Sequence, residues 1–245
     1  MKKERLDVVL HQRGFFDSRE SARRAVMAGD VHVDGFANPK PATPVAQDAQ
    51  MTIDAQPRFV GRGGLKLDAA LDHFGIDVRD KLAIDIGAST GGFTDCLLQR
   101  GARKVYAIDV GHNQLAWKIR QDPRVVVMEK VNARHAGEGF LPEIGDICVI
   151  DVSFISLTLI LPSALALTSA EADVIALIKP QFELERADVS RGGIVREPDL
   201  HQKVQDKIAA FIEKSGHEVV GIAPSAITGT DGNQEFFICA RKRSA

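Results

Sequence analysis

The sequence predicts an α/β protein built on an open, Rossmann-like sheet of seven strands, with the last strand antiparallel, preceded by a small α+β module. From Leu82 onward, short apolar runs alternate with helical patterns, which is typical of a mainly parallel sheet covered on both faces. The last two runs are joined only by Pro224–Gln234, which is too short for a crossover helix. We therefore expect the final strand to run antiparallel to its neighbours.

Helical spacing dominates the beginning of the chain. The segment Leu6–Leu10 carries an apolar stripe, which predicts a first helix that ends at Gly14. Asp17 and Glu20 have the spacing of a capping box, which predicts the start of a second helix. That helix is expected to end at Gly29.

A short hairpin is predicted next. Val31–Gly35 alternates as a strand into a turn, and Met51–Ile53 is expected to return beside it. Two helices and a hairpin make a module with a modest core. We therefore expect one domain over residues 1–60 and a second over residues 61–245, joined by a linker at about 55–63.

The second domain is predicted to contain seven strands and four helices. The strands are expected at Leu82–Ile86, Val105–Asp109, Val125–Met128, Ile147–Asp151, Val174–Ile178, Val219–Ala223 and Glu235–Ala240. The helices are expected at Gly92–Arg100, Asn113–Gln121, Leu157–Leu167 and Asp199–Ser215. Seven strands with the seventh reversed are the usual sheet of class I methyltransferases.

The run Ile84–Phe93 reads I-D-I-G-A-S-T-G-G-F, an apolar strand that breaks into glycines and then a helix. Such a turn lets the backbone approach a ligand and presents free N–H groups to it. The spacing G-x-x-x-G-G matches neither the dinucleotide nor the Walker fingerprint. Asp109 closes the next apolar run, where a carboxylate suits a ribose diol. These features favour S-adenosylmethionine over NAD or ATP, and a turn that merely connects two elements is the structural alternative.

Four further charged residues stand at the predicted sheet edge or approach it. Asp151 ends the fourth strand, Lys179 follows the fifth, and Glu235 begins the last. Lys66 follows the glycine-rich, basic run that starts at Gly61. Ligands of open α/β sheets bind outside the carboxyl ends of the strands. Taken alone, each carboxylate could serve only to form a turn, and each lysine could simply be exposed to solvent. Together, beside a glycine-rich turn, they indicate a catalytic site.

Composition limits the classes of protein to which this chain can belong. Hydrophobic residues make up 44% of the chain and charged residues 26%, which is ordinary for a globular protein. No apolar run approaches the roughly 20 residues of a membrane span, so we expect a cytoplasmic protein without a membrane partner. Cys96, Cys148 and Cys239 are far apart and show no metal-ligand spacing, so no metal is expected. A monomer is favoured.

The N-terminal residues are locally basic and carry a specific pattern. Residues 2–24 contain seven basic and four acidic residues, although the whole chain has a net charge of −2. The pattern R-L-D-x-x-L…R-G-F…S-R-x-x-A-x-x-x-V-x-x-G-x-V-x-V-D-G over Arg5–Ile53 resembles the S-four-type RNA-binding module. The resemblance implies that the second helix faces RNA phosphates. The residues expected to bind RNA are Arg5, Arg19, Arg23, Arg24 and, in the second domain, Arg62.

Nearly the whole chain resembles the TlyA (haemolysin A) family of ribosomal RNA 2′-O-methyltransferases, whose catalytic domain is FtsJ-like. The runs that carry this resemblance are R-G-G-x-K, D-x-G-A-S-T-G-G-F-T-x-x-L-L-x-R-G-A, D-V-G-x-x-Q-L-A-W, D-P-R-V-V-V, D-x-S-F-I-S-L, K-P-Q-F-E and G-N-x-E-F-F. It implies S-adenosylmethionine as cofactor, ribosomal RNA or a ribosomal subunit as partner, and cytidine as the nucleotide that is methylated.

The resemblance also implies roles for individual residues. The catalytic Lys-Asp-Lys-Glu tetrad carries over to Lys66, Asp151, Lys179 and Glu235. Lys179 is expected to contact the 2′-hydroxyl and accept its proton, while the two carboxylates hold the lysines. The expected cofactor contacts are Asp85, Gly87, Ala88, Ser89, Gly91, Gly92 and Phe93 at the methionine end, Asp109 at the ribose and Asn132 at the adenine.

Three other functions stay open at this point. A membrane-active haemolysin is suggested by the older family name, but the sequence has no span or cationic amphipathic helix to support it. A non-catalytic RNA-binding assembly factor would not need the intact tetrad. Enzymes that methylate base nitrogens commonly carry Asn-Pro-Pro-aromatic after the fourth strand, where this chain has Asp-Val-Ser-Phe from Asp151 to Phe154.

Overall fold

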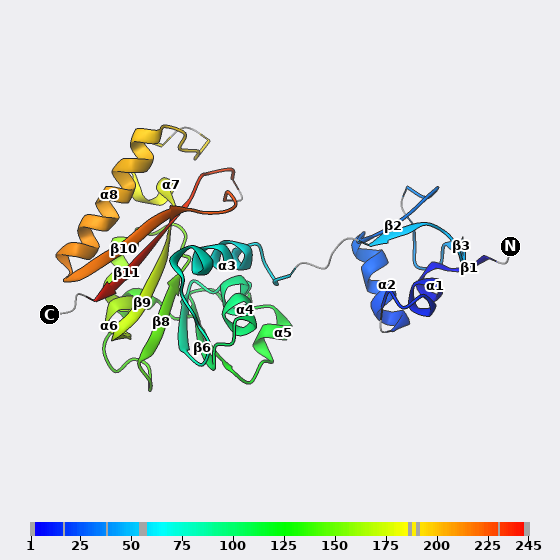
Figure 1. The fold of residues 1–245 in the computed structure, drawn as a ribbon, viewed down its shortest axis with the longest axis horizontal. Helices are drawn as coiled ribbons and strands as arrows, with labels where there is room; N and C mark the ends of the chain where they lie inside the picture. Colours follow the sequence, from blue (N-terminus) through cyan, green and yellow to red (C-terminus); the bar gives the residue numbers. More distant parts are fainter. Residues whose placement is uncertain are drawn as a thin grey trace. The chain divides into compact units, whose positions relative to one another are not determined.

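The computed structural model describes residues 3–16, 18–37, 39–53, 58–185, 188–189, 192–229 and 231–242 (Figure 1). Residue contacts divide the chain into two compact units, Met1–Pro57 and Arg58–Ala245. Of the expected linker, residues 55–57 lie outside the described part of the chain. Phe59, just after them, is buried in the core of the second unit.

The first unit contains two helices and two small antiparallel sheets. Its elements are β1 (Lys3–Arg5), α1 (Leu6–Gln12), α2 (Arg19–Ala28), β2 (Val31–Val33), β3 (Pro44–Ala46) and β4 (Met51–Ile53). Strand β4 returns beside β2, which confirms the predicted hairpin strands. The pairing of β1 with β3 was not predicted, because strands of three residues carry too little periodicity to be recognised.

The first unit is held by its own apolar core. Leu6 and Leu10 of α1 are fully buried against residues of α2 and the small strands, including Ala22 and Val45. The cap of α2 is Ser18, whose side-chain oxygen accepts a hydrogen bond from the backbone N–H of Ser21. The predicted cap was therefore wrong by one residue; Asp17 itself lies outside the described residues.

The second unit is built on a seven-stranded sheet in the order β10-β11-β9-β8-β5-β6-β7. Its strands are β5 (Leu82–Ile86), β6 (Lys104–Asp109), β7 (Val125–Glu129), β8 (Gly145–Ile150), β9 (Thr168–Ile178), β10 (His217–Pro224) and β11 (Phe236–Lys242). Strand β11 lies between β9 and β10 and is antiparallel to both. The Rossmann-like sheet with its last strand reversed is thus confirmed.

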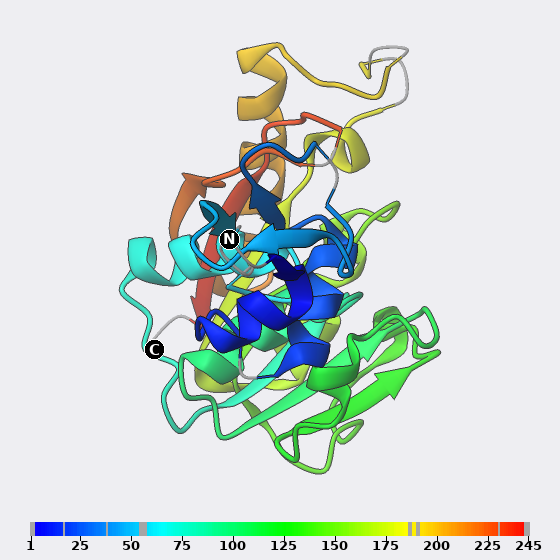
Figure 2. The same ribbon diagram turned by 90° about the vertical axis from the view of Figure 1, so that its right-hand side faces the viewer.

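Helices cover both faces of this sheet. They are α3 (Gly63–Phe74), α4 (Gly92–Gln99), α5 (Trp117–Arg120), η1 (Ala133–His135), η2 (Leu157–Leu159), α6 (Leu161–Ala166), α7 (Pro180–Glu183) and α8 (Pro198–Lys214). Alternate strand residues point to opposite cores: Ala83 packs with α3 and α4, while Ile84 packs with α6 and α8. Helix α8, drawn in orange, lies along β10 in both views (Figures 1 and 2).

Two predicted helices are shorter in the structure, for local reasons. The helix predicted at 113–121 is only α5, because Asn113 has φ +58°, which is outside the helical region. The helix predicted at 157–167 divides into η2 and α6, and Pro162, which has no N–H for the ladder, stands in the first turn of α6. Within the described residues, no helix has the length and apolar character needed to cross a membrane.

Candidate functional site

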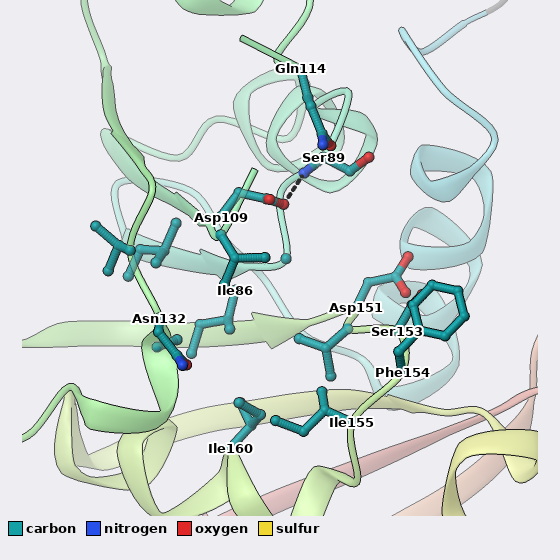
Figure 3. Close-up of a pocket in the computed structure, with 16 residues that line it drawn as sticks. Ile86, Ser89, Asp109, Gln114, Asn132, Asp151, Ser153, Phe154, Ile155 and Ile160 are labelled. Atoms are coloured by element: carbon teal, nitrogen blue, oxygen red, sulfur yellow. Dashed lines mark hydrogen bonds between the residues drawn. The ribbon is translucent and has the colours of Figure 1, made fainter. Parts of the chain in front are cut away.

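A pocket of about 380 Å³ opens where the parallel strands end (Figure 3). Its walls come from the ends of β5 and β6, from the start of η1, and from the segment that follows β8. Figure 3 shows Asp109, Asn132 and Asp151 at three sides of this space, with Ile86 between them. A smaller recess of about 110 Å³ continues along the glycine turn, from Gly63 to Phe93, and shares Asp151 with the pocket.

The glycine turn forms one wall because only glycine fits at its first position. Gly87 has φ +87°, and a Cβ there would lie 2.2 Å from the carbonyl oxygen of Asp151. The N–H groups of Gly87 and Ala88 both donate to the carbonyl of Ile108, at 2.8 and 3.2 Å. The turn is therefore fixed by backbone bonds, and Ser89, Thr90 and Gly92 line the recess beyond it.

Asp109 joins two segments of the pocket wall. Its Oδ2 accepts a hydrogen bond from the Ser89 N–H at 2.8 Å, and its Oδ1 accepts one from the Gly111 N–H at 2.6 Å. Each carboxylate oxygen has two acceptor sites, so one remains on each for a ligand. Asp109 can thus shape the pocket and bind a diol in it.

Asn132 and Gln114 line the pocket from two loops. The Oδ1 of Asn132 accepts a hydrogen bond from the Arg134 N–H at 3.1 Å and caps η1. Its Nδ2 makes no hydrogen bond among the described residues and is available to a ligand. Gln114 belongs to the run D-V-G-x-x-Q-L-A-W, but no feature of that run singles it out as a ligand contact.

The resemblance predicts that Asp85 contacts the methionine end of the cofactor. Asp85 lines neither cavity and is fully buried in β5. Its Oδ2 accepts a hydrogen bond from the Thr94 hydroxyl at 2.6 Å, while its Oδ1 has no partner among the described residues. Burial raises the pKa of Asp85 to about 7, and the nearby Asp151 carboxylate adds to this. The side chain of Asp85 therefore joins β5 to α4 through Thr94.

The four tetrad residues form two ion pairs. The Nζ of Lys66, on α3, lies 2.5 Å from Oε2 of Glu235, and both side chains are buried. The Nζ of Lys179 lies 2.5 Å from Oδ1 of Asp151 and donates to the Ser153 hydroxyl at 2.9 Å. Each lysine thus has its own carboxylate, and Asp151 places one pair at the edge of both cavities.

The residues expected to bind RNA are all exposed. In the first unit, Arg5 and Arg19 both contact Asp7, and Arg23 lies 3.9 Å from Glu20. In the second unit, Arg62 donates from Nη2 to the carbonyl of Thr228 at 2.8 Å. Arg62 therefore also ties the start of α3 to the loop before Glu235.

Two residues near the tetrad were not predicted as functional. Phe154 is 90% exposed, has φ +64°, and its ring lies 4.9 Å from that of Phe182. A non-glycine residue with positive φ stores strain that its surroundings must hold. Both residues stand in predicted motifs, D-x-S-F-I-S-L and K-P-Q-F-E, but exposure and backbone strain cannot be read from a motif.

Glu183 holds the strained segment. Its Oε2 accepts a hydrogen bond from the Ser156 hydroxyl, and its Oε1 accepts one from the Leu157 N–H, both at 2.6 Å. Lys207 of α8 lies 3.1 Å from Oε2. The side chain of Glu183 is only 1% exposed, so it is a buried brace between the segments that follow β8 and β9.

Among the described residues, no group of three or more His, Cys, Asp or Glu side chains gathers as metal ligands would. The three cysteines are buried free thiols, and burial raises the pKa of each, to about 12 for Cys96 and Cys239. Neither observation adds a reactive group to the site.

Comparison with known proteins matches both units. Residues 59–242 match the FtsJ-like methyltransferase family, and residues 4–35 match the S4 domain. The chain is 50% identical over 239 residues to YqxC of Bacillus subtilis, which is named provisionally as an rRNA methyltransferase; the match covers 97% of this chain and 85% of that protein. It is 42% identical to the 16S/23S rRNA (cytidine-2′-O)-methyltransferase TlyA of Mycobacterium tuberculosis, over 99% of this chain and 91% of the relative.

Two solved structures are similar to this chain in fold. A protein of Streptococcus thermophilus, provisionally named a hemolysin, superposes with a TM-score of 0.75 at 45% identity, over all of this chain and 90% of that one. The magnesium protoporphyrin IX methyltransferase of Synechocystis PCC 6803 shares the fold, with a TM-score of 0.51 at 16% identity, over 78% of this chain and 90% of that one.

The buried Asp85 predicts a pH dependence of stability. With a pKa of about 7 in the folded state and near 4 in the unfolded state, Asp85 binds more protons when folded, so stability falls as pH rises through this window and levels off above it. Asp85→Asn should remove this fall and gain about 3 kcal/mol relative to the native chain between pH 5 and pH 8. Urea unfolding at both pH values measures it. Asp80→Asn, at an exposed site, is the control; equal pH dependence in all three proteins would refute the assignment.

The hydrogen bonds accepted by Glu183 predict that its removal lowers stability and loosens the segment after β8. Glu183→Ala leaves the Ser156 hydroxyl and the Leu157 N–H without their acceptor, so the free energy of unfolding should fall by about 2–3 kcal/mol. Hydrogen exchange at Leu157 should accelerate as well. Glu185→Ala, at an exposed site two residues away, should leave both values unchanged. Equal effects of the two substitutions would contradict the brace.

Proposed function

Because the chain belongs to the FtsJ-like methyltransferase family and carries an S4 domain, we propose that it methylates the 2′-oxygen of cytidine in ribosomal RNA with S-adenosylmethionine. The observation that carries the proposal is the Lys179–Asp151 pair at the edge of the pocket, with the Lys66–Glu235 pair as its counterpart. The rRNA methyltransferases among its relatives support the choice of RNA.

The pocket fits the cofactor in size and in donors. A volume of about 380 Å³ lies within the usual range for small-molecule sites. Asp109 would bind the ribose diol, and Nδ2 of Asn132 would donate to the adenine. The glycine turn would admit the methionine end along the recess between Gly63 and Phe93. When bound, S-adenosylmethionine supplies a methyl group on a positively charged sulfonium.

The tetrad would orient the acceptor and remove its proton. A ribose hydroxyl is a poor nucleophile, so its alignment and the charge that develops on its oxygen matter most. We assign the contact with the hydroxyl to Nζ of Lys179, which takes the proton while Asp151 takes one from the same amine. Lys66 would stabilise the charge on the oxygen, held in place by Glu235.

The aromatic pair beside the tetrad suits an unstacked base. To reach a 2′-hydroxyl at its sugar edge, the nucleotide must leave its helix, which costs a few kcal/mol. Phe154 is exposed on the segment that also carries Asp151, so a base can stack on its ring. The tetrad is complete within one chain, which supports a monomer as the active unit. Ribosomal RNA as substrate supports a cytoplasmic site of action.

Asp109→Ala should weaken binding of S-adenosylmethionine by about 1–3 kcal/mol, because the ribose loses its partner and two backbone N–H groups of the wall lose their acceptor. Titration calorimetry with a chelator present measures this. Asp206→Ala, exposed on α8, is the matched control. Binding that disappeared with the chelator, or an affinity of Asp109→Ala equal to that of the control, would overturn the pocket assignment.

Lys179→Ala should abolish methyl transfer and leave the affinities for cofactor and RNA within a few-fold of the native values. Tritium transfer to ribosomal RNA, followed by mapping of 2′-O-methyls, tests the function and this residue together. Lys179→Arg should not restore transfer, because a guanidinium stays charged and cannot pass on a proton. Lys203→Ala, an exposed lysine paired with Asp188, should keep full activity.

Two outcomes would contradict these assignments. Label on a base instead of a ribose would refute 2′-O-methylation. Near-native turnover of Lys179→Arg would make the lysine an electrostatic clamp and leave water or Asp151 as the base.

A further inference from the structure

A buried carboxylate lies beneath the surface arginines of the first unit. Asp7, in the first turn of α1, has a side chain that is 1% exposed, whereas Arg5 and Arg19 are 47% and 55% exposed. Arg5 donates to Asp7 from Nε at 3.0 Å and from Nη2 at 2.8 Å. Nε of Arg19 lies 3.2 Å from the same carboxylate. Asp7 thus holds arginines from β1 and from α2.

The backbone at Asp7 fixes a further segment of the same surface. Its N–H donates to the carbonyl of Pro41 at 3.0 Å, next to Lys40. A groove of about 540 Å³ opens there, lined by Arg5, Arg23 and Lys40 and by apolar side chains that include the exposed Met27. Asp7 therefore lies where the segments that form this cationic groove meet.

The pairing leaves the arginines able to bind a polyanion. A guanidinium has five N–H donors; Arg5 gives two to Asp7, and Arg19 reaches it through one. The hydrogen bonds from Arg5 lower the pKa of Asp7, so the carboxylate stays charged and keeps both partners. The remaining donors can contact phosphate oxygens in the planar, paired geometry that arginine favours.

We propose that Asp7 is a positioning residue for RNA binding, which holds Arg5 and Arg19 in the orientation in which they meet phosphates. This inference rests on the proposed RNA substrate. Long-range electrostatics predicts the opposite effect of this residue, because an acid near the interface repels phosphates. If Asp7 orients the two arginines, its loss should weaken RNA binding, because both long side chains must then be ordered when RNA binds. Whether removal of the Asp7 charge weakens or strengthens RNA binding therefore distinguishes orientation from long-range repulsion.

Asp7→Asn therefore provides the test. The probe is a fluorescein-labelled ribosomal RNA stem-loop, titrated by anisotropy at fixed salt. We expect Kd to rise roughly tenfold, the factor that corresponds to losing one charge-assisted hydrogen bond, although the unit becomes more positive. Asp48→Asn makes the same change of charge at an exposed site of the same unit, and its Kd should stay equal or fall. Equal Kd values for the two variants would overturn the proposal.

A double-mutant cycle separates positioning from a general loss of structure. If Asp7 acts through the two arginines, Asp7→Asn should add nothing in the Arg5→Ala/Arg19→Ala background. An unfolded unit would lower affinity again in that background, which would also overturn the proposal. Failure of the native chain to bind the RNA would refute the proposed substrate instead, and S-adenosylmethionine titration of the same samples would show whether the second unit is intact.

Discussion

The close approach of the turn after β5 to the backbone after β8 is the constraint on which the site depends. No side chain fits at Gly87, since a Cβ would lie 2.2 Å from the carbonyl of Asp151. The N–H of Asp151 donates to the carbonyl of Ile86 at 2.9 Å, and the N–H of Gly87 donates to that of Ile108. Backbone bonds alone thus bring three strand ends together. Asp109, at the end of β6, and Asp151, directly after β8, therefore lie next to this turn and line the pocket.

Among the residues that the structure describes, the buried charges around this contact follow one rule, from which Asp85 departs. Removing a charge from water costs several kcal/mol unless a partner of opposite sign and hydrogen bonds replace the solvent. Glu235 has Lys66, and Glu183 has Lys207. Asp85 has no cation beside it among the described residues, only uncharged donors of Thr94, and burial raises its pKa to about 7. The same physics therefore gives ion pairs at the tetrad and a carboxyl with a raised pKa in β5, just before the turn.

Much of the fold could be predicted from the sequence, because apolar runs and their alternation with helical patterns report burial directly. All seven strands of the large sheet and the reversal of the last one follow from that pattern. The position of Asp151 and Lys179 at one sheet edge was also predictable, since β8 and β9 are parallel and end there. Partners of individual polar groups were not, because they depend on distances across the fold. Asp85, for example, lines neither cavity and is fully buried, with its Oδ2 accepting a hydrogen bond from the Thr94 hydroxyl. The cap of α2 depends instead on local backbone geometry, which places the Ser18 hydroxyl at the N–H of Ser21.

The arrangement of carboxylates also explains how a chain with a net charge of −2 can present cationic surfaces. Asp7 and Glu183 are each 1% exposed, while their partners Arg5 and Lys207 are 47% and 44% exposed. The acids are counted in the net charge but lie inside, and the bases meet the solvent. An anion that approaches either surface first meets the exposed cations, so the local field there is more positive than the sum suggests. Net charge alone therefore underestimates the affinity of such a chain for a polyanion, and the burial of its acids decides where that affinity lies.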